Sequence, residues 1–242
     1  METIVEPAAA APHPSKSPRR RLGWMVLTPI VVALAYSALL ASKRTRALAL
    51  GMADENHVVE LLTFVLLLVG GAYGLWLAVR ARRRGGQPAW VVAFYVVFAG
   101  FLLLIGMEEV SWGQWFFRFE TPESIARINT QQEFTLHNLE GIGGKTVWLR
   151  LAFGVGGLVG IALWFLPRWR AVAVPPALWA WFVVITLFSL GDLVTDFVGS
   201  GSPVAALFEV MSEIVELLIA GVACLYLWIN SKGLLGASAT PH

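Results

Sequence analysis

Six apolar runs of about 20 residues recur along the 242-residue chain, covering roughly 23–42, 58–79, 89–107, 147–166, 177–196 and 204–229. A helix needs about 20 apolar residues to cross a hydrocarbon core about 30 Å thick. In lipid the backbone must satisfy its own hydrogen bonds, and the runs lack the alternation of barrel strands. The sequence therefore predicts an all-α fold, a polytopic membrane bundle of about six transmembrane helices.

Little of the chain remains for a soluble domain, since 57% of the residues are hydrophobic and the mean hydropathy is +0.68. We expect one transmembrane domain over 23–230, after a disordered basic tail over 1–22 and before a flexible tail over 231–242. The first apolar run is longer than the hydrophobic core of a signal peptide, which has about 7–15 residues, and this favours an uncleaved anchor. Cleavage after its Ala-Leu-Leu-Ala-Ser end is the alternative.

The charge balance does not predict a nucleic-acid partner. The formal net charge is +2, with a pI near 8.9, but the basic residues stand in short segments beside the apolar runs. There they act as topology signals rather than as a groove for phosphates. The single cysteine, Cys224, lies inside the last run and can form no disulfide within the chain.

The distribution of Lys and Arg predicts the orientation. With a cytoplasmic N-terminus, the inner segments hold eleven of these residues: Lys16, Arg19, Arg20, Arg21, Arg80, Arg82, Arg83, Arg84, Arg168, Arg170 and Lys232. The outer segments hold seven: Lys43, Arg44, Arg46, Arg118, Arg127, Lys145 and Arg150. The positive-inside rule then predicts that both termini are cytoplasmic.

The acidic residues are more unevenly distributed than the basic ones. Outside the N-terminal tail, all of them fall on the predicted outer side or in the outer half of a span: Asp54, Glu55, Glu60, Glu108, Glu109, Glu120, Glu123, Glu133, Glu140, Asp192, Asp196, Glu209, Glu213 and Glu216. Acids contribute little to orientation, so topology alone does not require this. Any chemistry is expected at the extracytoplasmic face.

Two constellations of acids lie at or inside span ends. Glu108 and Glu109 end the third span, where the helix dipole disfavours an acid, and Glu108 shares a helical face with Trp112 and Trp115. Asp192 and Asp196, and likewise Glu209, Glu213 and Glu216, follow helical spacing near the outer ends of spans five and six. Ionised carboxylates at such depth are costly and face a bundle interior or a wet cavity. For the acids of spans five and six, a proton- or metal-binding cavity is one interpretation and a structural ion pair with Arg150 is the other. For Glu108 and Glu109, the alternative to a functional role is that both simply solvate the helix end.

Two histidines stand at helical spacing from acids. His57 and Glu60 open the second span at i, i+3, and Glu133 and His137 are at i, i+4 if that segment is helical. Such pairs suit a shared metal or a His–carboxylate pair. The alternative is that each histidine is simply solvated at the membrane surface.

The stretch 108–146 is predicted to be an outer polar segment. Thr121-Pro122-Glu123 reads as a helix start, so a short surface helix is expected over 122–132, with the residues after it returning over the bundle as a lid. Elsewhere, Gly70-Gly71, Gly154, Gly156-Gly157 and Gly160 form small-residue faces suited to close helix packing.

Three segments resemble a family of bacterial multi-pass membrane proteins of unknown function, which carry an E-E-[I/V]-S-W-G-Q motif and a later L-H-N motif. The segments are 54–63 (DENHVVELLT), 108–114 (EEVSWGQ) and 129–138 (NTQQEFTLHN). The resemblance covers about 52–140 and implies a protein of the bacterial inner membrane. The residues are also similar to those of intramembrane metal-dependent lipid hydrolases, which usually use three His ligands, whereas only His57 and His137 are available here.

Three functions are consistent with these patterns. The first is an enzyme acting at the extracytoplasmic face on a lipid or lipid-linked substrate, with a divalent metal as candidate cofactor. Its predicted catalytic residues are Glu108, Glu109, Glu133 and His137; its predicted metal ligands are His57, Glu60, Glu109, His137, Asp192 and Glu213; and Trp112, Gln114, Asn138 and Glu216 complete the site. The second is a proton- or cation-coupled transporter, although the inner halves of the spans hold almost no polar residues. The third is a non-catalytic partner or sensor subunit of a membrane complex.

Overall fold

The computed structural model describes residues 18–53, 57–129, 131–136, 138–141, 145–198 and 203–236. The fold is all-helical, and no strand occurs among these residues. Its long helices are α1 (Pro18–Ala41), α3 (Val58–Arg84), α4 (Ala89–Glu109), α7 (Thr146–Leu163), α8 (Trp179–Val198) and α9 (Pro203–Gly236). Shorter elements connect them: α2 (Arg46–Met52), η1 (Ser111–Gly113), α5 (Gln114–Phe117), α6 (Glu123–Ala126), η2 (Pro167–Trp169) and η3 (Pro176–Leu178).

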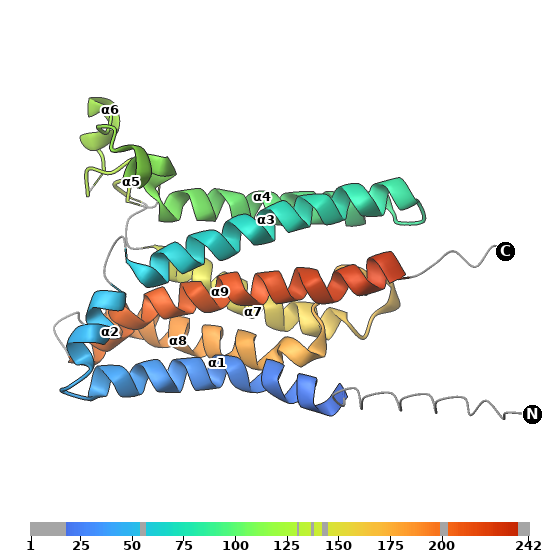
Figure 1. Cartoon of the computed structure of the whole chain (residues 1–242), viewed down its shortest axis with the longest axis horizontal. Coiled ribbons are helices and arrows are strands. Elements are labelled where there is room, and N and C mark those ends of the chain that lie inside the picture. Colours follow the sequence, from blue (N-terminus) through green and yellow to red (C-terminus); the bar gives the residue numbers. More distant parts are fainter. Residues whose placement is uncertain are drawn as a thin grey trace, which may run out of the picture.

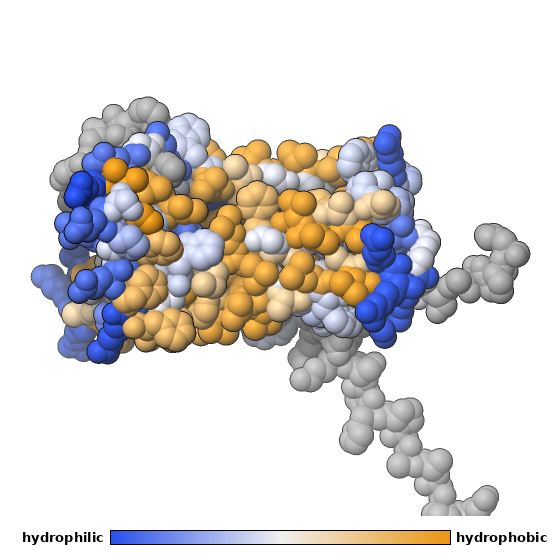
Figure 2. Space-filling view, turned by 90° about the horizontal axis from the view of Figure 1, so that it is seen from above, coloured by the Kyte–Doolittle hydropathy of each residue, from blue (hydrophilic) through white to orange (hydrophobic). Residues whose placement is uncertain are grey.

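The prediction of six spanning helices is confirmed, because six helices in the described part of the chain are long and apolar enough to cross a membrane. They run alternately up and down, so α1 begins and α9 ends at the same end of the bundle (Figure 1). A hydrophobic band separates two hydrophilic ends (Figure 2). A multi-pass membrane protein explains this band, since a continuous apolar surface of that extent is not left in contact with water.

The two ends of the bundle differ in charge. One end carries α2, α5 and α6, together with all the acidic side chains that the structure describes, and we call it the acid-rich end. The other, here the basic end, carries Arg80, Arg82, Arg83, Arg84, Arg168, Arg170 and Lys232. The division of charge expected from the sequence is therefore present in three dimensions.

Helix α9 is the central helix of the bundle. It contacts α3, α7, α8 and α1, while α3 pairs with α4 and α7 pairs with α8. In its most apolar stretch 56% of the residues are buried inside the protein, against 39% or less in each of the other five helices. The remaining helices therefore leave most of their apolar surface for lipid.

Glycines bring the paired helices close together, as the sequence predicted. A Cβ added to Gly71 would lie 2.5 Å from Leu103 of α4, and one added to Gly157 would lie 1.8 Å from the Phe182 ring of α8. Gly70, Gly154 and Gly160 are similarly crowded, but Gly156 has nothing within 4 Å and does not belong to the packing face. These approaches gain dispersion contacts, which drive association where lipid replaces the hydrophobic effect.

A proline inside α1 is compensated by a side chain of α8. Pro29 has no N–H to donate to the carbonyl of Met25 one turn earlier. The Trp181 indole Nε1 donates to that carbonyl instead, at 2.7 Å. An unsatisfied carbonyl in the hydrocarbon region would be costly, so this bond also fixes the position of α1 against α8.

The connection between α7 and α8 turns into the bundle at the basic end. Val172, Ala173 and Val174 are buried, and three consecutive carbonyls of this loop accept side-chain hydrogen bonds. The donors are Tyr95 to Ala171 O (2.8 Å), Tyr226 to Val172 O (2.7 Å) and Asn230 Nδ2 to Ala173 O (3.1 Å). Tyr73 and Ser231 add a further bond of 2.8 Å nearby. The expectation of almost no polar residues in this half was therefore wrong.

Several predicted boundaries also need correction. Helix α9 continues to Gly236, so residues 231–236 belong to the bundle and not to a flexible tail. Helix α3 extends five residues beyond the predicted 79, because its Arg-rich last turn continues the helix until Gly85 adopts a positive φ of 72°. The surface helix predicted over 122–132 is only the single turn of α6, and its N-cap is Pro122, without a side-chain cap bond.

Candidate functional site

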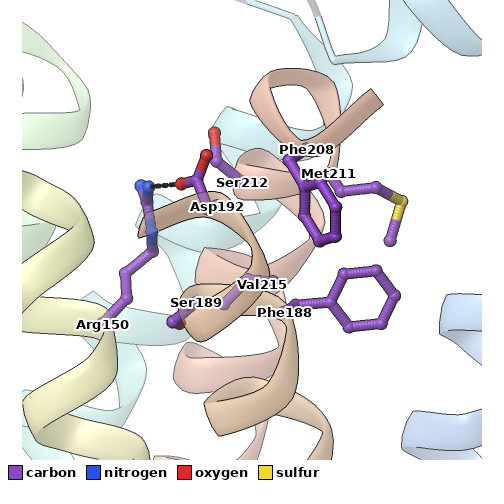
Figure 3. A pocket seen from close by; sticks show the side chains of 8 residues that line it. All are labelled: Arg150, Phe188, Ser189, Asp192, Phe208, Met211, Ser212 and Val215. Carbon is purple, nitrogen blue, oxygen red and sulfur yellow. Dashed lines mark hydrogen bonds and ion pairs between the residues drawn. The ribbon is translucent and has the colours of Figure 1, made fainter. Parts of the chain in front are cut away.

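A buried arginine joins three helices just inside the acid-rich end. Arg150 of α7 donates from one guanidinium nitrogen to Asp192 of α8 at 2.7 Å (Figure 3). Its other guanidinium nitrogen donates to Glu216 of α9 at 2.6 Å. The Arg150 side chain is 10% exposed. Buried charges are stable only when they are paired. The structure shows the ion pair with Arg150 that was one of the two interpretations of these acids, with the two guanidinium nitrogens bonding carboxylates of two different helices.

Further carboxylates surround this pair. Glu109, the last residue of α4, interacts electrostatically with Glu216, Glu213 and Glu60 as well as with Arg150. We call Glu60, Glu109, Asp192, Glu213 and Glu216, with Arg150, the acid cluster. Tyr36 of α1 in turn interacts electrostatically with Glu213. Two carboxylates thus bond the guanidinium, Glu109 interacts with it electrostatically, and Glu60 and Glu213 interact with Glu109. With Tyr36, these side chains come from all six long helices.

The cluster is closely packed around Arg150. Phe188, Ser189, Phe208, Met211, Ser212 and Val215 line the space beside Arg150 and Asp192, which leaves no room for a water molecule (Figure 3). Ser189 is 1% exposed, and its hydroxyl has no hydrogen-bond partner among the described residues. A buried hydroxyl without a partner costs about 1–3 kcal/mol, so Ser189 is a group that a ligand could satisfy if the helices separate slightly.

Gln114 holds the outer polar segment over the end of α4. Its amide Nε2 donates to Phe119 O at 3.0 Å and to Thr121 Oγ1 at 2.9 Å, and its Oε1 accepts from the Phe134 backbone N–H at 2.9 Å. One side chain therefore ties 119–121 to 134. Gln114 is one of the predicted site residues, and these observed contacts all lie within the outer polar segment.

Glu108 and Glu133 contact the same segment. Glu108 accepts hydrogen bonds from the Trp112 indole and, at 2.7 Å, from the Leu136 backbone N–H. Glu133 accepts a bond from the Ser111 hydroxyl at 3.1 Å. Residues 131–136 are not helical, so the condition for an i, i+4 spacing of Glu133 and His137 is not met there, and His137 itself lies outside the described residues. The backbone N–H groups of Gln131 and Glu133 instead donate to the side-chain Oδ1 of Asn129.

The turn between α4 and α5 has an unusual backbone. Ser111, Trp112 and Gly113 are consecutive and have φ values of 46°, 55° and 89°. Glycine adopts this region freely, but other L-residues pay about 1–2 kcal/mol there. The turn reverses the chain within the 108–114 motif, which places Glu109 on the bundle side and Gln114 under the outer segment.

The remaining predicted residues are not assembled into a metal centre in the described part of the chain. His57 is the exposed N-cap residue of α3, one turn before Glu60. Asn138 donates to Gln131 in the outer segment. His137 lies outside the described residues, as do the side chains of Asp196 and Glu209. No three His, Cys, Asp or Glu residues of the described chain lie close enough to hold a metal ion. The metal site stays a prediction.

Comparisons with models of protein families, with curated proteins and with solved structures found no match for this chain. Any proposal on function must therefore come from the arrangement of its own residues.

Proposed function

We propose that this chain is an enzyme of the bacterial inner membrane that acts on a lipid or lipid-linked substrate, with general acid–base catalysis by carboxylates at the acid-rich end. The observation that carries the proposal is a group of five half-buried carboxylates from four helices: Asp192 and Glu216 bond Arg150, and Glu109 interacts electrostatically with Arg150, Glu216, Glu213 and Glu60. Carboxylates inside a bundle with an apolar surface are costly, and neither the hydrophobic band nor the helix packing requires them.

Glu109 is the proposed acid–base residue. It is the last residue of α4, and it joins the acid cluster to the strained turn at 111–113. Its electrostatic partners are provided by α3, α7 and α9. Carboxylates in such surroundings exchange protons with a bound substrate, and the contribution of a positioned acid or base is about 10²–10⁴ in rate. Arg150 would act as a positioning residue, because both of its ends are already bonded to carboxylates.

We expect that Glu109→Gln abolishes the change in lipid composition that the wild-type chain causes in cells. The measurement is mass spectrometry of extracted lipids and lipid-linked precursors from cells carrying the empty vector, the wild type or a variant. Glu120→Gln is the matched control, because Glu120 is exposed in the same outer segment. The proposal fails if the wild type leaves every lipid species as in the vector, or if Glu109→Gln retains the wild-type profile.

The metal is tested on the same purified proteins by elemental analysis. A divalent ion bound one per chain, and lost in His137→Ala, would assign the cofactor predicted for this site. If the purified protein contains no metal and the chain still changes the lipids, the carboxylates catalyse the reaction without a metal ion.

The proposed orientation places the acid-rich end outside the cytoplasm, with both termini inside. It is supported by the seven basic side chains at the basic end, where no acid occurs among the described residues. In a Cys224→Ala background, we expect a membrane-impermeant maleimide to label Lys145→Cys in intact cells. Lys232→Cys should react only after the cells are opened. Both positions are exposed at opposite ends, so the reverse pattern would place the acid cluster on the cytoplasmic side.

A cation- or proton-coupled transporter is the second candidate. It is favoured by the second polar layer, in which Tyr95, Tyr226 and Asn230 hydrogen-bond with one another and with the buried loop at the basic end. Cation or proton flux into proteoliposomes, lost in Glu109→Gln and in Glu213→Gln, would favour this function over the enzyme.

A further inference from the structure

A second cavity lies at the acid-rich end, on the α1 side of α9. It has a volume of about 280 Å³ and is lined by Ser37, Leu40, Ala41, Arg46, Leu50, Leu207 and Val210. These residues come from α1, α2 and α9, and five of the seven are apolar. The cavity is near the lower end of small-molecule sites, which begin at about 300 Å³. It is large enough for part of an amphiphile rather than for a whole lipid.

The walls of this cavity are fixed by hydrogen bonds. The Tyr36 hydroxyl donates to Ala49 O at 2.7 Å, which holds α2 against α1, and Ala49 is completely buried. The Thr45 hydroxyl donates to Leu39 O at 2.8 Å and closes the turn between the two helices. Arg46 is the first residue of α2, and these hydrogen bonds fix α2 against α1. Its side chain lines the cavity.

The charge around the cavity opposes the charge of the rest of this end. Lys43, Arg44 and Arg46 occur within four residues and are exposed, and no ion pair or side-chain hydrogen bond joins them to another described residue. They follow the apolar span of α1, which ends at Ala41, at the position where lipid headgroups are expected. Basic residues at a membrane surface attract anionic lipids, by about 1 kcal/mol each.

An apolar stripe leads from the cavity along α1. Leu27, Val31 and Leu34 are each at least half exposed, and they continue at helical spacing into Ser37 and Ala41 of the cavity wall. The stripe runs toward the middle of the hydrophobic band, as an acyl chain in the outer leaflet would. A phosphate headgroup at Arg46 pairs with the arginine charge, and acyl chains along this stripe cover its apolar surface.

We propose that the cavity between α1, α2 and α9 binds an anionic phospholipid, with its headgroup phosphate at Arg46 and an acyl chain on the Leu40, Leu50, Leu207 and Val210 surface. The inference does not depend on the enzymatic proposal, because the acid cluster contributes no residue to the cavity. The proposed lipid belongs to the outer leaflet and contacts the surface of the protein.

The test uses the full chain in nanodiscs of phosphatidylcholine with one fifth phosphatidylglycerol, and counts by native mass spectrometry the lipids retained after release. We expect phosphatidylglycerol to be retained over phosphatidylcholine, and Arg46→Gln to lower this retention about fivefold, the factor that corresponds to about 1 kcal/mol. Ala41→Phe, which fills the cavity without changing the charge, should have an effect of similar size.

Arg127→Gln is the matched control, since it removes one exposed positive charge from the same end but outside the cavity. It should retain phosphatidylglycerol as the wild type does, and thermal unfolding should show that all three variants are folded. Equal retention of both lipids by the wild type would overturn the proposal. So would equal losses in Arg46→Gln and Arg127→Gln, or full retention in Ala41→Phe.

Discussion

Replacing Arg150 by methionine is expected to lower the free energy of unfolding by about 3–5 kcal/mol, the cost typical of removing one partner from a buried ion pair. The variant leaves Asp192 and Glu216 facing each other where Arg150 bonded both, with side chains only 16% and 25% exposed. Thermal unfolding of the purified protein in one detergent measures the loss.

Two comparisons separate this effect from a general loss of charge. The triple variant Arg150→Met, Asp192→Asn, Glu216→Gln should regain most of the stability, because neutral amides can bond each other without a buried charge. Arg127→Met removes the exposed pair with Glu123 and should change stability by no more than about 1 kcal/mol. If Arg150→Met unfolds at the same temperature as Arg127→Met, the buried network contributes nothing to stability.

Gly157→Ala is expected to destabilise the protein by about 1–3 kcal/mol, as overpacking of a tight contact does. The new methyl group would lie 1.8 Å from the Phe182 ring, closer than any non-bonded contact, so α7 and α8 must separate. Thermal unfolding measures the effect, and the double variant with Phe182→Leu should recover part of it because the ring is then absent.

Gly156→Ala is the matched control for this prediction. It lies on the same helix, one residue away, and an added Cβ there meets nothing within 4 Å. Alanine in a helix is more favourable than glycine by about 0.5–1 kcal/mol, so this variant should be slightly stabilised. Opposite signs at adjacent positions are the expected signature. Equal effects at Gly156 and Gly157 would contradict the packing described for α7 and α8.

The spans were predictable because the length of an apolar run is fixed by the thickness of the membrane. Helix ends were less predictable. Arg82, Arg83 and Arg84 continue α3 beyond its apolar residues, and Ser231 to Gly236 continue α9, because polar residues can extend a helix out of the membrane as easily as end it. The apolar composition shows which residues of a helix lie in lipid, but it does not show at which residue the helix ends.

The candidate site was predictable in part. Acids at helical spacing pointed to the bundle interior, and Arg150 was the one cation at similar depth, so their pairing followed from burial energetics. The lid contacts of Gln114 and the loop contacts of Tyr95 and Asn230 join residues 20 to 135 positions apart. Local periodicity carries no information on such contacts. The left-handed φ values of Ser111 and Trp112 were not predicted either, because neither residue type favours that region of the backbone.

The buried loop at the basic end has a consequence for biogenesis. Two of its three bonded carbonyls, those of Val172 and Ala173, depend on Tyr226 and Asn230 of α9, which is synthesised after α7 and α8. Until α9 arrives, these carbonyls need water as their partner. The loop must therefore wait at the membrane surface while α7 and α8 insert, and it is drawn into the bundle only when α9 packs. Packing of α9 is in this sense the step that closes the basic end.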